Sequence, residues 1–171
     1  MSATASPAPP SVRPVTLDPI DRQLLAELRA NARVSNAALG RAVGLTAPAV
    51  VERVRRLEAA GVITGYHAAL DAEAVGFGLT VFLSISLEHH GAAAVGAFTH
   101  AIRAIDEVVE CHQVTGRPDF LVKVVARDVD HYKAVLMTRL SDVPGIDRVE
   151  SHVVLQTYKD DDVPLARRAS T

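Results

Sequence analysis

Residues 35–61 read SNAALGRAVGLTAPAVVERVRRLEAAG, two short helical segments separated by a glycine-containing turn. Ser35 and Thr46 can accept hydrogen bonds from the free amides at a helix start, so we expect each to cap a helix. Gly44 provides the sharp turn, and Pro48 suits the first turn of the second helix, where a missing N–H costs little. Gly61 is expected to end that helix. The pattern predicts a helix-turn-helix, which places its second helix in the major groove of double-stranded DNA.

The second helix is predicted to have two faces. Val50, Val54 and Leu57 recur at helical spacing and are expected to face inward, which leaves three arginines on the outer surface. Such arginines contact phosphates or guanine edges in complexes with DNA, although they also fit an ordinary solvated face. The surrounding motif favours DNA contact by at least one of them. The predicted DNA contacts are Ser35, Arg41, Thr46, Ala47, Pro48, Ala49, Arg53, Arg55 and Arg56, with Arg33 as a further phosphate contact.

The start of this helix carries few hydrogen-bonding groups, because it consists of alanine, proline and valine. Direct base reading is therefore expected to be sparse, and DNA shape and bending are expected to supply much of the specificity.

A supporting helix is predicted ahead of the motif. Residues 1–16 are rich in Pro, Ala and Ser and predict a disordered leader. Asp18 followed by Pro19 is a typical helix start, and Asp21 complements the positive end of the helix dipole. The buried stripe of this helix is Ile20, Leu24, Leu25 and Leu28. We therefore expect a three-helix DNA-binding domain over residues 17–61.

Composition narrows the class of protein. The 171 residues are 49% hydrophobic, and the single cysteine, Cys111, excludes an internal disulfide and a Cys-based zinc site. Because the sequence has no membrane-length apolar run and no signal pattern, we expect a cytoplasmic, nucleoid-associated protein with no membrane partner.

The net charge of −2 is unevenly distributed along the chain. Residues 1–66 carry +3, from eight Lys/Arg and five Asp/Glu, and residues 67–171 carry −5, from ten Lys/Arg and fifteen Asp/Glu. A basic half joined to an acidic half fits a DNA-reading module fused to a sensor or partner module.

The second half is predicted to fold as a separate domain. Residues 62–78 are expected to form a linker, with a short strand over 62–70 and a turn at Gly76 and Gly78. Alternating hydrophobicity then predicts strands, and three-to-four spacing predicts helices. The predicted elements are a strand over 80–87, a helix over 92–105, strands over 107–115 and 119–126, a helix after Asp128 with the stripe Val129, Tyr132, Leu136 and Leu140, and a strand over 146–157.

This order predicts the ferredoxin-like βαββαβ arrangement over residues 79–158, followed by a flexible tail over 159–171. The predicted fold class is therefore α+β, with an N-terminal helix-turn-helix, of winged type, joined to a C-terminal ferredoxin-like ligand-binding domain. The sheet face not covered by helices still carries apolar groups such as Phe82. An exposed apolar face usually marks an interface, so we expect a homodimer through this domain.

These stretches resemble the leucine-responsive regulatory protein/AsnC family, also called feast/famine regulators. The resemblance rests on LDPIDRQLLAELRANARVSNAALGRAVGL, VVERVRRLEAAGVITGYHAAL and VTGRPDFLVKVVARD, and extends over about residues 17–158. The family's pattern Gly-x2-Asp-x4-Val-x3-Asp/Glu falls on Gly116, Asp119, Val124 and Asp128. The resemblance implies a transcription factor that forms dimers, then tetramers, octamers or larger assemblies. It also implies that an amino acid or related metabolite changes assembly or DNA affinity.

The loop TGRPD is the predicted effector site. Exposed amides around Gly116 can bind a carboxylate, and the Asp119 carboxylate can bind an ammonium group. An ordinary hairpin turn would also use Gly and Asp, for backbone freedom and local hydrogen bonds. In the family this loop lines a pocket between subunits, which favours the functional interpretation. The predicted effector contacts are Thr115, Gly116, Arg117, Pro118, Asp119 and Ser151.

The sequence gives less support to a metal site, an enzyme or a chromosome-organising protein. His89 and His90 lack a second cluster at metal-ligand spacing and are interpreted as surface residues, so no metal or cofactor is expected. No nucleophile–base motif and no phosphate-cradling glycine loop is present, so the chain is not expected to be an enzyme. A sirohaem-decarboxylase-like enzyme on the same fold stays an alternative, disfavoured by the basic recognition helix. A chromosome-organising protein that wraps DNA with little sequence preference is the other alternative.

Overall fold

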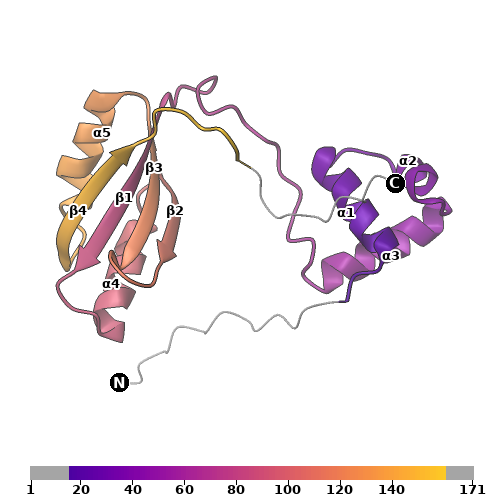
Figure 1. The fold of residues 1–171 in the computed structure, drawn as a ribbon, viewed down its shortest axis with the longest axis horizontal. Coiled ribbons are helices and arrows are strands. Elements are labelled where there is room, and N and C mark those ends of the chain that lie inside the picture. Colours follow the sequence, from indigo (N-terminus) through magenta and orange to yellow (C-terminus); the bar gives the residue numbers. More distant parts are fainter. Residues whose placement is uncertain (1–15, 161–171) are drawn as a thin grey trace. The chain divides into compact units, whose positions relative to one another are not determined.

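The computed structural model describes residues 16–160. Within them, residues 16–69 form one compact unit and residues 70–160 form the other (Figure 1). Nearly all of the predicted leader, and most of the predicted tail, lie outside the described residues.

The first unit is a three-helix domain that contains the predicted helix-turn-helix. Helices α1 (Pro19–Ala30), α2 (Asn36–Val43) and α3 (Ala47–Ala59) pack around a small core, in which Leu24, Leu39 and Val50 are buried. The Asp18 and Asp21 side chains each accept from the other residue's amide, a capping box that starts α1. The Ser35 hydroxyl accepts from the Ala38 amide at 3.2 Å, which confirms the predicted cap of α2.

The turn between α2 and α3 depends on two glycines. Gly44 has φ +72°, the left-handed conformation that glycine adopts without penalty, and the Leu45 amide reaches back to the Gly40 carbonyl at 2.8 Å. Gly40 lies inside α2, and a Cβ there would stand 2.5 Å from the Leu45 carbonyl oxygen. Only glycine fits this close approach, a requirement that the sequence pattern did not reveal.

Two local predictions in this unit were wrong. Thr46 occupies the N-cap position of α3, but its side chain makes no capping hydrogen bond. Pro48 is the second residue of the helix and lacks an N–H, so one of the two amides that a cap side chain can bond is missing. Residues 62–70 form no strand. Instead, the Val62 amide donates to the Leu57 carbonyl at 2.9 Å and closes the end of α3 beyond Gly61, and residues 16–69 contain no other strand with which these residues could pair.

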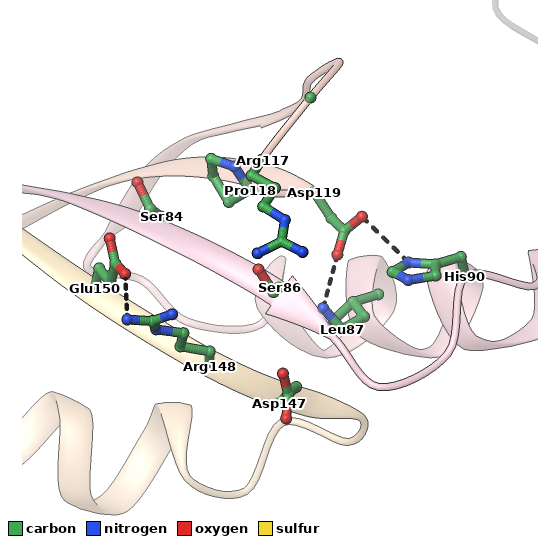
Figure 2. A pocket seen from close by; sticks show the side chains of 11 residues that line it. Ser84, Ser86, Leu87, His90, Arg117, Pro118, Asp119, Asp147, Arg148 and Glu150 are labelled. Carbon is green, nitrogen blue, oxygen red and sulfur yellow. Dashed lines mark hydrogen bonds and ion pairs between the residues drawn. The ribbon is translucent and has the colours of Figure 1, made fainter.

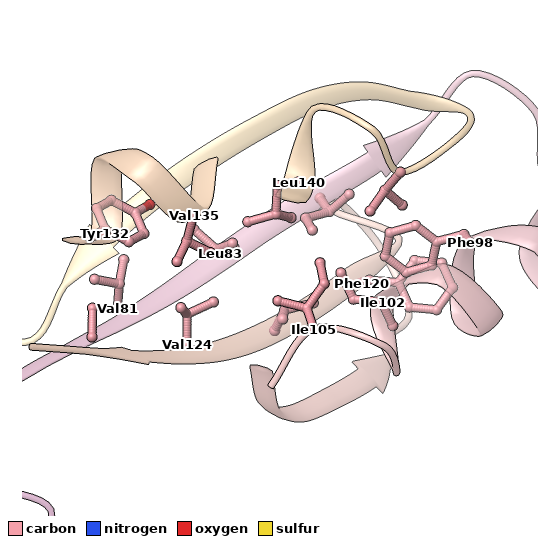
Figure 3. Close-up of a cluster of buried hydrophobic side chains, with 14 of the residues drawn as sticks. Val81, Leu83, Phe98, Ile102, Ile105, Phe120, Val124, Tyr132, Val135 and Leu140 are labelled. Carbon is pink, nitrogen blue, oxygen red and sulfur yellow. The ribbon is translucent and has the colours of Figure 1, made fainter. Parts of the chain in front are cut away.

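The second unit is the predicted ferredoxin-like domain. Its elements in order are β1 (Leu79–Leu87), α4 (Ala92–Ile102), β2 (Val108–Gln113), β3 (Phe120–Ala126), α5 (Val129–Val135), a π-helical turn η1 (Leu136–Leu140) and β4 (Ile146–Val153). The strands form one antiparallel sheet in the order β2-β3-β1-β4 (Figure 1). The helices cover one face of the sheet, where the apolar residues of β1 and β3 alternate into the core with those of α4 and α5 (Figure 3).

The packing of α5 differs from the predicted stripe. Val129 is 67% exposed, because it lies in the first turn of the helix, directly after the N-cap Asp128. Tyr132, Val135 and Leu140 are the buried residues. The helix widens at η1, where the Ser141 amide donates to the Leu136 carbonyl five residues earlier. This wider turn changes the spacing of buried positions, so a regular helical period fails there.

Two predicted elements are shorter in the structure. Helix α4 ends at Ile102, although Ile105 remains buried beyond it. Strand β4 ends at Val153, opposite Val81, and Leu155 is 95% exposed. One further hydrogen bond, from the Val154 amide to the Thr80 carbonyl at 2.9 Å, follows the end of the strand.

Candidate functional site

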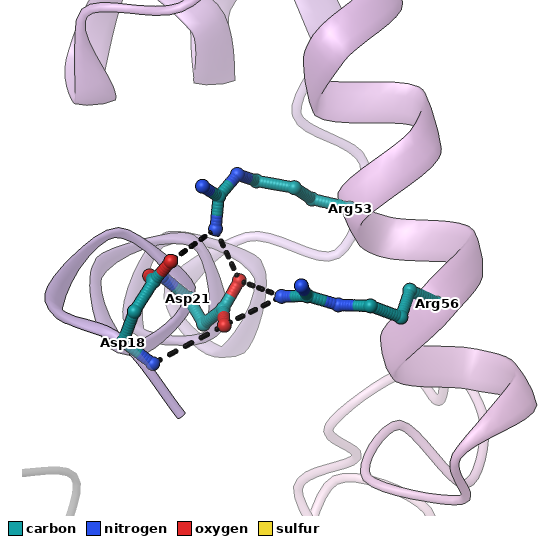
Figure 4. Close-up of polar contacts among 4 residues, drawn as sticks. All are labelled: Asp18, Asp21, Arg53 and Arg56. Carbon is teal, nitrogen blue, oxygen red and sulfur yellow. Dashed lines mark hydrogen bonds and ion pairs between the residues drawn. The ribbon is translucent and has the colours of Figure 1, made fainter. Parts of the chain in front are cut away.

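Two of the three predicted DNA-contact arginines of α3 bind carboxylates of α1. The Arg53 Nη1 atom lies 2.5 Å from Asp18 Oδ2 and 2.9 Å from Asp21 Oδ1 (Figure 4). The Arg56 Nη2 atom lies 2.7 and 2.6 Å from the two Asp21 oxygens. Asp21 is only 1% exposed, and its carboxylate also accepts from the Asp18 amide. These contacts attach α3 to the start of α1.

The electrostatics of this cluster agree with its geometry. Hydrogen bonding from Arg53 lowers the pKa of the Asp18 carboxyl, and the same contact raises the pKa of Arg53. Sequence reasoning placed Arg53 on the outer surface, whereas its side chain is only 26% exposed. The signal that could have revealed the pairing is the acidic pair at 18 and 21, which the sequence pattern assigned only to the start of the helix and to its dipole.

Other basic side chains of this unit remain available to a ligand. Arg55 is 77% exposed, and its nearest carboxylate, on Glu52, is 4.0 Å away. Arg41 and Arg33 are exposed and have no ion pair within residues 16–160. Pro48 at the start of α3 is exposed, Ala47 and Ala49 are partly exposed, and Val51 is 44% exposed. The helix thus presents a small apolar tip beside cations that can reach phosphates.

The second unit contains a pocket of about 460 Å³ at one end of its open sheet face (Figure 2). Gly116, Arg117, Pro118 and Asp119 of the predicted effector loop line it. Gly116 has φ +92°, and the Arg117–Pro118 peptide bond is cis. The remaining lining residues come from β1, the segment after it, and β4: Ser84, Ser86, Leu87, His90, Asp147, Arg148 and Glu150.

Asp119 fixes the loop against the end of β1. One carboxylate oxygen accepts from the Leu87 amide at 2.8 Å, and the other lies 3.2 Å from His90 Nδ1. The Asp119 amide also donates to the Ile85 carbonyl at 3.0 Å. One oxygen of the Asp119 carboxylate is therefore bonded to the protein backbone, and the other lies beside the His90 ring.

Two predicted effector residues do not line the pocket. Thr115 is exposed but absent from the lining. Ser151 pairs with Leu83, so it lies on the helix-covered face of the sheet. There the Tyr132 hydroxyl donates to the Ser151 hydroxyl at 2.6 Å.

A β-bulge places Asp147, which sequence reasoning missed. Ser86 pairs with Arg148, but the next residue, Leu87, pairs with Ile146, so Asp147 has no partner in the register. Arg148 and Glu150 alternate on the open face and form an ion pair of 2.8 Å. Strict alternation would point residue 147 to the opposite face, but the extra residue of a bulge redirects its side chain. A register shift of this kind leaves no pattern in a single sequence.

Comparison with known proteins matches both units of the chain to known domains. The AsnC-type helix-turn-helix domain matches residues 17–58, and the Lrp/AsnC ligand binding domain matches residues 80–164. The leucine-responsive regulatory protein of Haemophilus influenzae is 38% identical over 143 residues, which cover 84% of this chain and 86% of that protein. The chain belongs to the Lrp/AsnC family. The Escherichia coli K12 leucine-responsive regulatory protein is 37% identical over 84% of this chain and 87% of its own length.

Solved Lrp/AsnC structures have the same fold. A transcriptional regulator of Neisseria meningitidis, in complex with L-methionine, has a TM-score of 0.83 at 30% identity and covers 88% of this chain and 98% of its own. The feast or famine regulatory protein of Mycobacterium tuberculosis, also complexed with L-methionine, has a TM-score of 0.77 at 32% identity, covering 88% and 99%. No helix within residues 16–160 is long and apolar enough to cross a membrane.

Proposed function

We propose that this Lrp/AsnC chain is a sequence-specific transcriptional regulator whose DNA affinity or assembly responds to an amino acid. The observation that carries the proposal is a helix-turn-helix and a polar pocket built on separate folding units. Relatives named as leucine-responsive and relatives solved with L-methionine support an amino acid as the effector. The same relatives are named as regulators, which supports action by binding without catalysis.

For DNA, we propose that α3 enters the major groove. Arg55 and Arg41 are the candidate phosphate contacts, because they are exposed cations, one on each helix of the motif. Thr46 has a hydroxyl that makes no capping bond and is available to a phosphate. Arg53 and Arg56 would act by holding α3 on α1, since each already binds Asp21.

For assembly, we propose a homodimer through the open sheet face, with further association to tetramers, octamers or larger particles. This face carries the half-buried side chains Phe82, Leu121 and Val125. Lys123 lies between Leu121 and Val125 on β3, opposite Phe82, and its charge is paired with Glu110 of β2 at 3.1 Å. An apolar sheet face that no helix covers usually marks a protein interface.

The test is fluorescence anisotropy with DNA from upstream of the protein's own gene, at fixed salt, with random DNA as competitor and each common amino acid as effector. We expect specific binding that one amino acid shifts. A specific-to-nonspecific affinity ratio near one would instead identify a chromosome-organising protein. Arg55→Ala should reduce the slope of log affinity against log salt by about 0.9, the value for one lost phosphate contact. Arg103→Ala, an exposed arginine of the other unit, is the matched control.

A further inference from the structure

We propose that the pocket selects a free amino acid with a polar side chain, which Arg117 holds by its carboxylate and Asp147 holds by its ammonium group. This inference rests on the proposed function, because it assumes that the pocket of Figure 2 is the effector site. It differs from the leucine and methionine suggested by the names of the relatives.

The first argument concerns the charged side chains of the pocket and which of them have a partner in the protein. Asp119 is bound by the Leu87 amide and His90, and Arg148 is bound by Glu150. Arg117 and Asp147 line the same pocket but have no hydrogen bond or ion pair within residues 16–160. Among residues 16–160, the pocket therefore offers a cation and an anion without partners, the complement of the zwitterion that every free amino acid carries.

The second argument is position. The Arg117 guanidinium reaches from the loop into the pocket, and Asp147 projects from the start of β4 on the other side (Figure 2). The bulge at Ser86 and Leu87 brings Asp147 to this face. Bulges occur often next to functional sites, where they redirect a side chain.

The third argument concerns the rest of the lining. Among the described residues that line the pocket, Pro118 alone offers an apolar side chain to a ligand, because Leu87 is 4% exposed and belongs to the core. Apart from the residues already named, the lining consists of Gly116, the His90 ring, the Ser86 hydroxyl, the Ser84 hydroxyl, which lies 3.2 Å from His152 Nε2, and the Arg148–Glu150 pair. An aliphatic side chain would cover these polar groups without replacing their water hydrogen bonds, which is unfavourable. A side chain that donates or accepts hydrogen bonds would replace them.

The experiment is isothermal titration calorimetry on the full chain. The polar probes are L-glutamine, L-asparagine, L-arginine and L-glutamate, and the aliphatic probes are L-leucine and L-methionine. We expect at least one polar probe to bind about tenfold or more tightly than both aliphatic probes. Asp147→Asn and Arg117→Gln should each weaken that binding by about tenfold to a hundredfold, the effect of one lost charged hydrogen bond. Asp130→Asn, an exposed carboxylate in the first turn of α5, should change nothing.

Modified ligands separate the two roles. The N-acetyl derivative of the tightest probe lacks the ammonium charge, so it should bind weakly to the natural protein and lose little more in Asp147→Asn. The α-carboxamide derivative should behave in the same way with Arg117→Gln. If the affinity lost by modifying the ligand and the affinity lost by the substitution simply add, the substituted residue does not contact the modified group of the ligand.

The possible results distinguish failure of this inference from failure of the proposed amino-acid response. Tighter binding of leucine or methionine overturns the polar selectivity and leaves an amino-acid-responsive regulator in place. Binding of a polar probe that both pocket variants leave unchanged overturns the assignment of Arg117 and Asp147. Absence of binding by all six probes and by the other common amino acids overturns both this inference and the proposed amino-acid response.

Discussion

Replacement of Asp21 by Asn should loosen the helix-turn-helix without affecting the sheet domain. The 1%-exposed Asp21 carboxylate accepts hydrogen bonds from Arg53 at 2.9 Å and from Arg56 at 2.6 and 2.7 Å. Removing one partner of a buried ion pair typically costs about 3–5 kcal/mol. Here the arginines are 26% and 56% exposed, so water recovers part of the loss. We therefore expect a cost of about 2–3 kcal/mol, after discounting for this exposure.

The assay is amide hydrogen exchange of the full chain, read on peptides from α1 and α3. A cost of about 2–3 kcal/mol corresponds to an opening constant about 30- to 150-fold larger. Peptides from β1 and β3 serve as an internal control, because they belong to the other unit. Glu52→Gln is the matched variant: its partner Arg55 is 4.0 Å away and both side chains are more than 70% exposed, so we expect less than about 0.5 kcal/mol.

Unchanged protection of α1 and α3 in Asp21→Asn would refute the reasoning. It would mean that the two arginines contribute little to holding these helices together. Arg53 and Arg56 would then return to the set of candidate phosphate contacts.

Three further predictions concern one glycine in each unit and the response of the first unit to acid. Gly40→Ala should lower the free energy of unfolding of the helix-turn-helix by about 1–3 kcal/mol, because the new Cβ would stand 2.5 Å from the Leu45 carbonyl oxygen. Gly96→Ala, in α4 with no atom within 4 Å of the new Cβ, should instead stabilise by about 0.5–1 kcal/mol; exchange on peptides of each unit measures both. Acid should also loosen the first unit. Hydrogen bonding from Arg53 lowers the pKa of Asp18 below 3.8, so this stabilisation is present above pH 3.8 and is lost as pH falls through the lower, folded-state pKa. A pH titration of exchange in α1 checks this, and protection that stays constant down through this range would contradict it.

Regular periodicity let the sequence determine most of the fold. Alternation in β1 and helical spacing in α4 identified the ferredoxin-like unit, because burying one face of each element forces apolar residues to recur at that period. The prediction failed where the period itself changes, at the π-helical turn η1, and where the predicted strand over 62–70 would have required a paired neighbour.

The sequence also located the candidate sites but not their geometry. Gly116 to Asp119 could be assigned from a local pattern, since the amides and the carboxylate belong to one short loop. Asp147 could not be assigned, because the bulge that brings it into the pocket depends on the pairing of β4 with β1. Likewise, an arginine on a helix has the same sequence signature whether it faces a phosphate or a carboxylate. Only the packing of α1 against α3 decides that Arg53 binds Asp18 and Asp21, because the partners lie more than thirty residues apart in the chain.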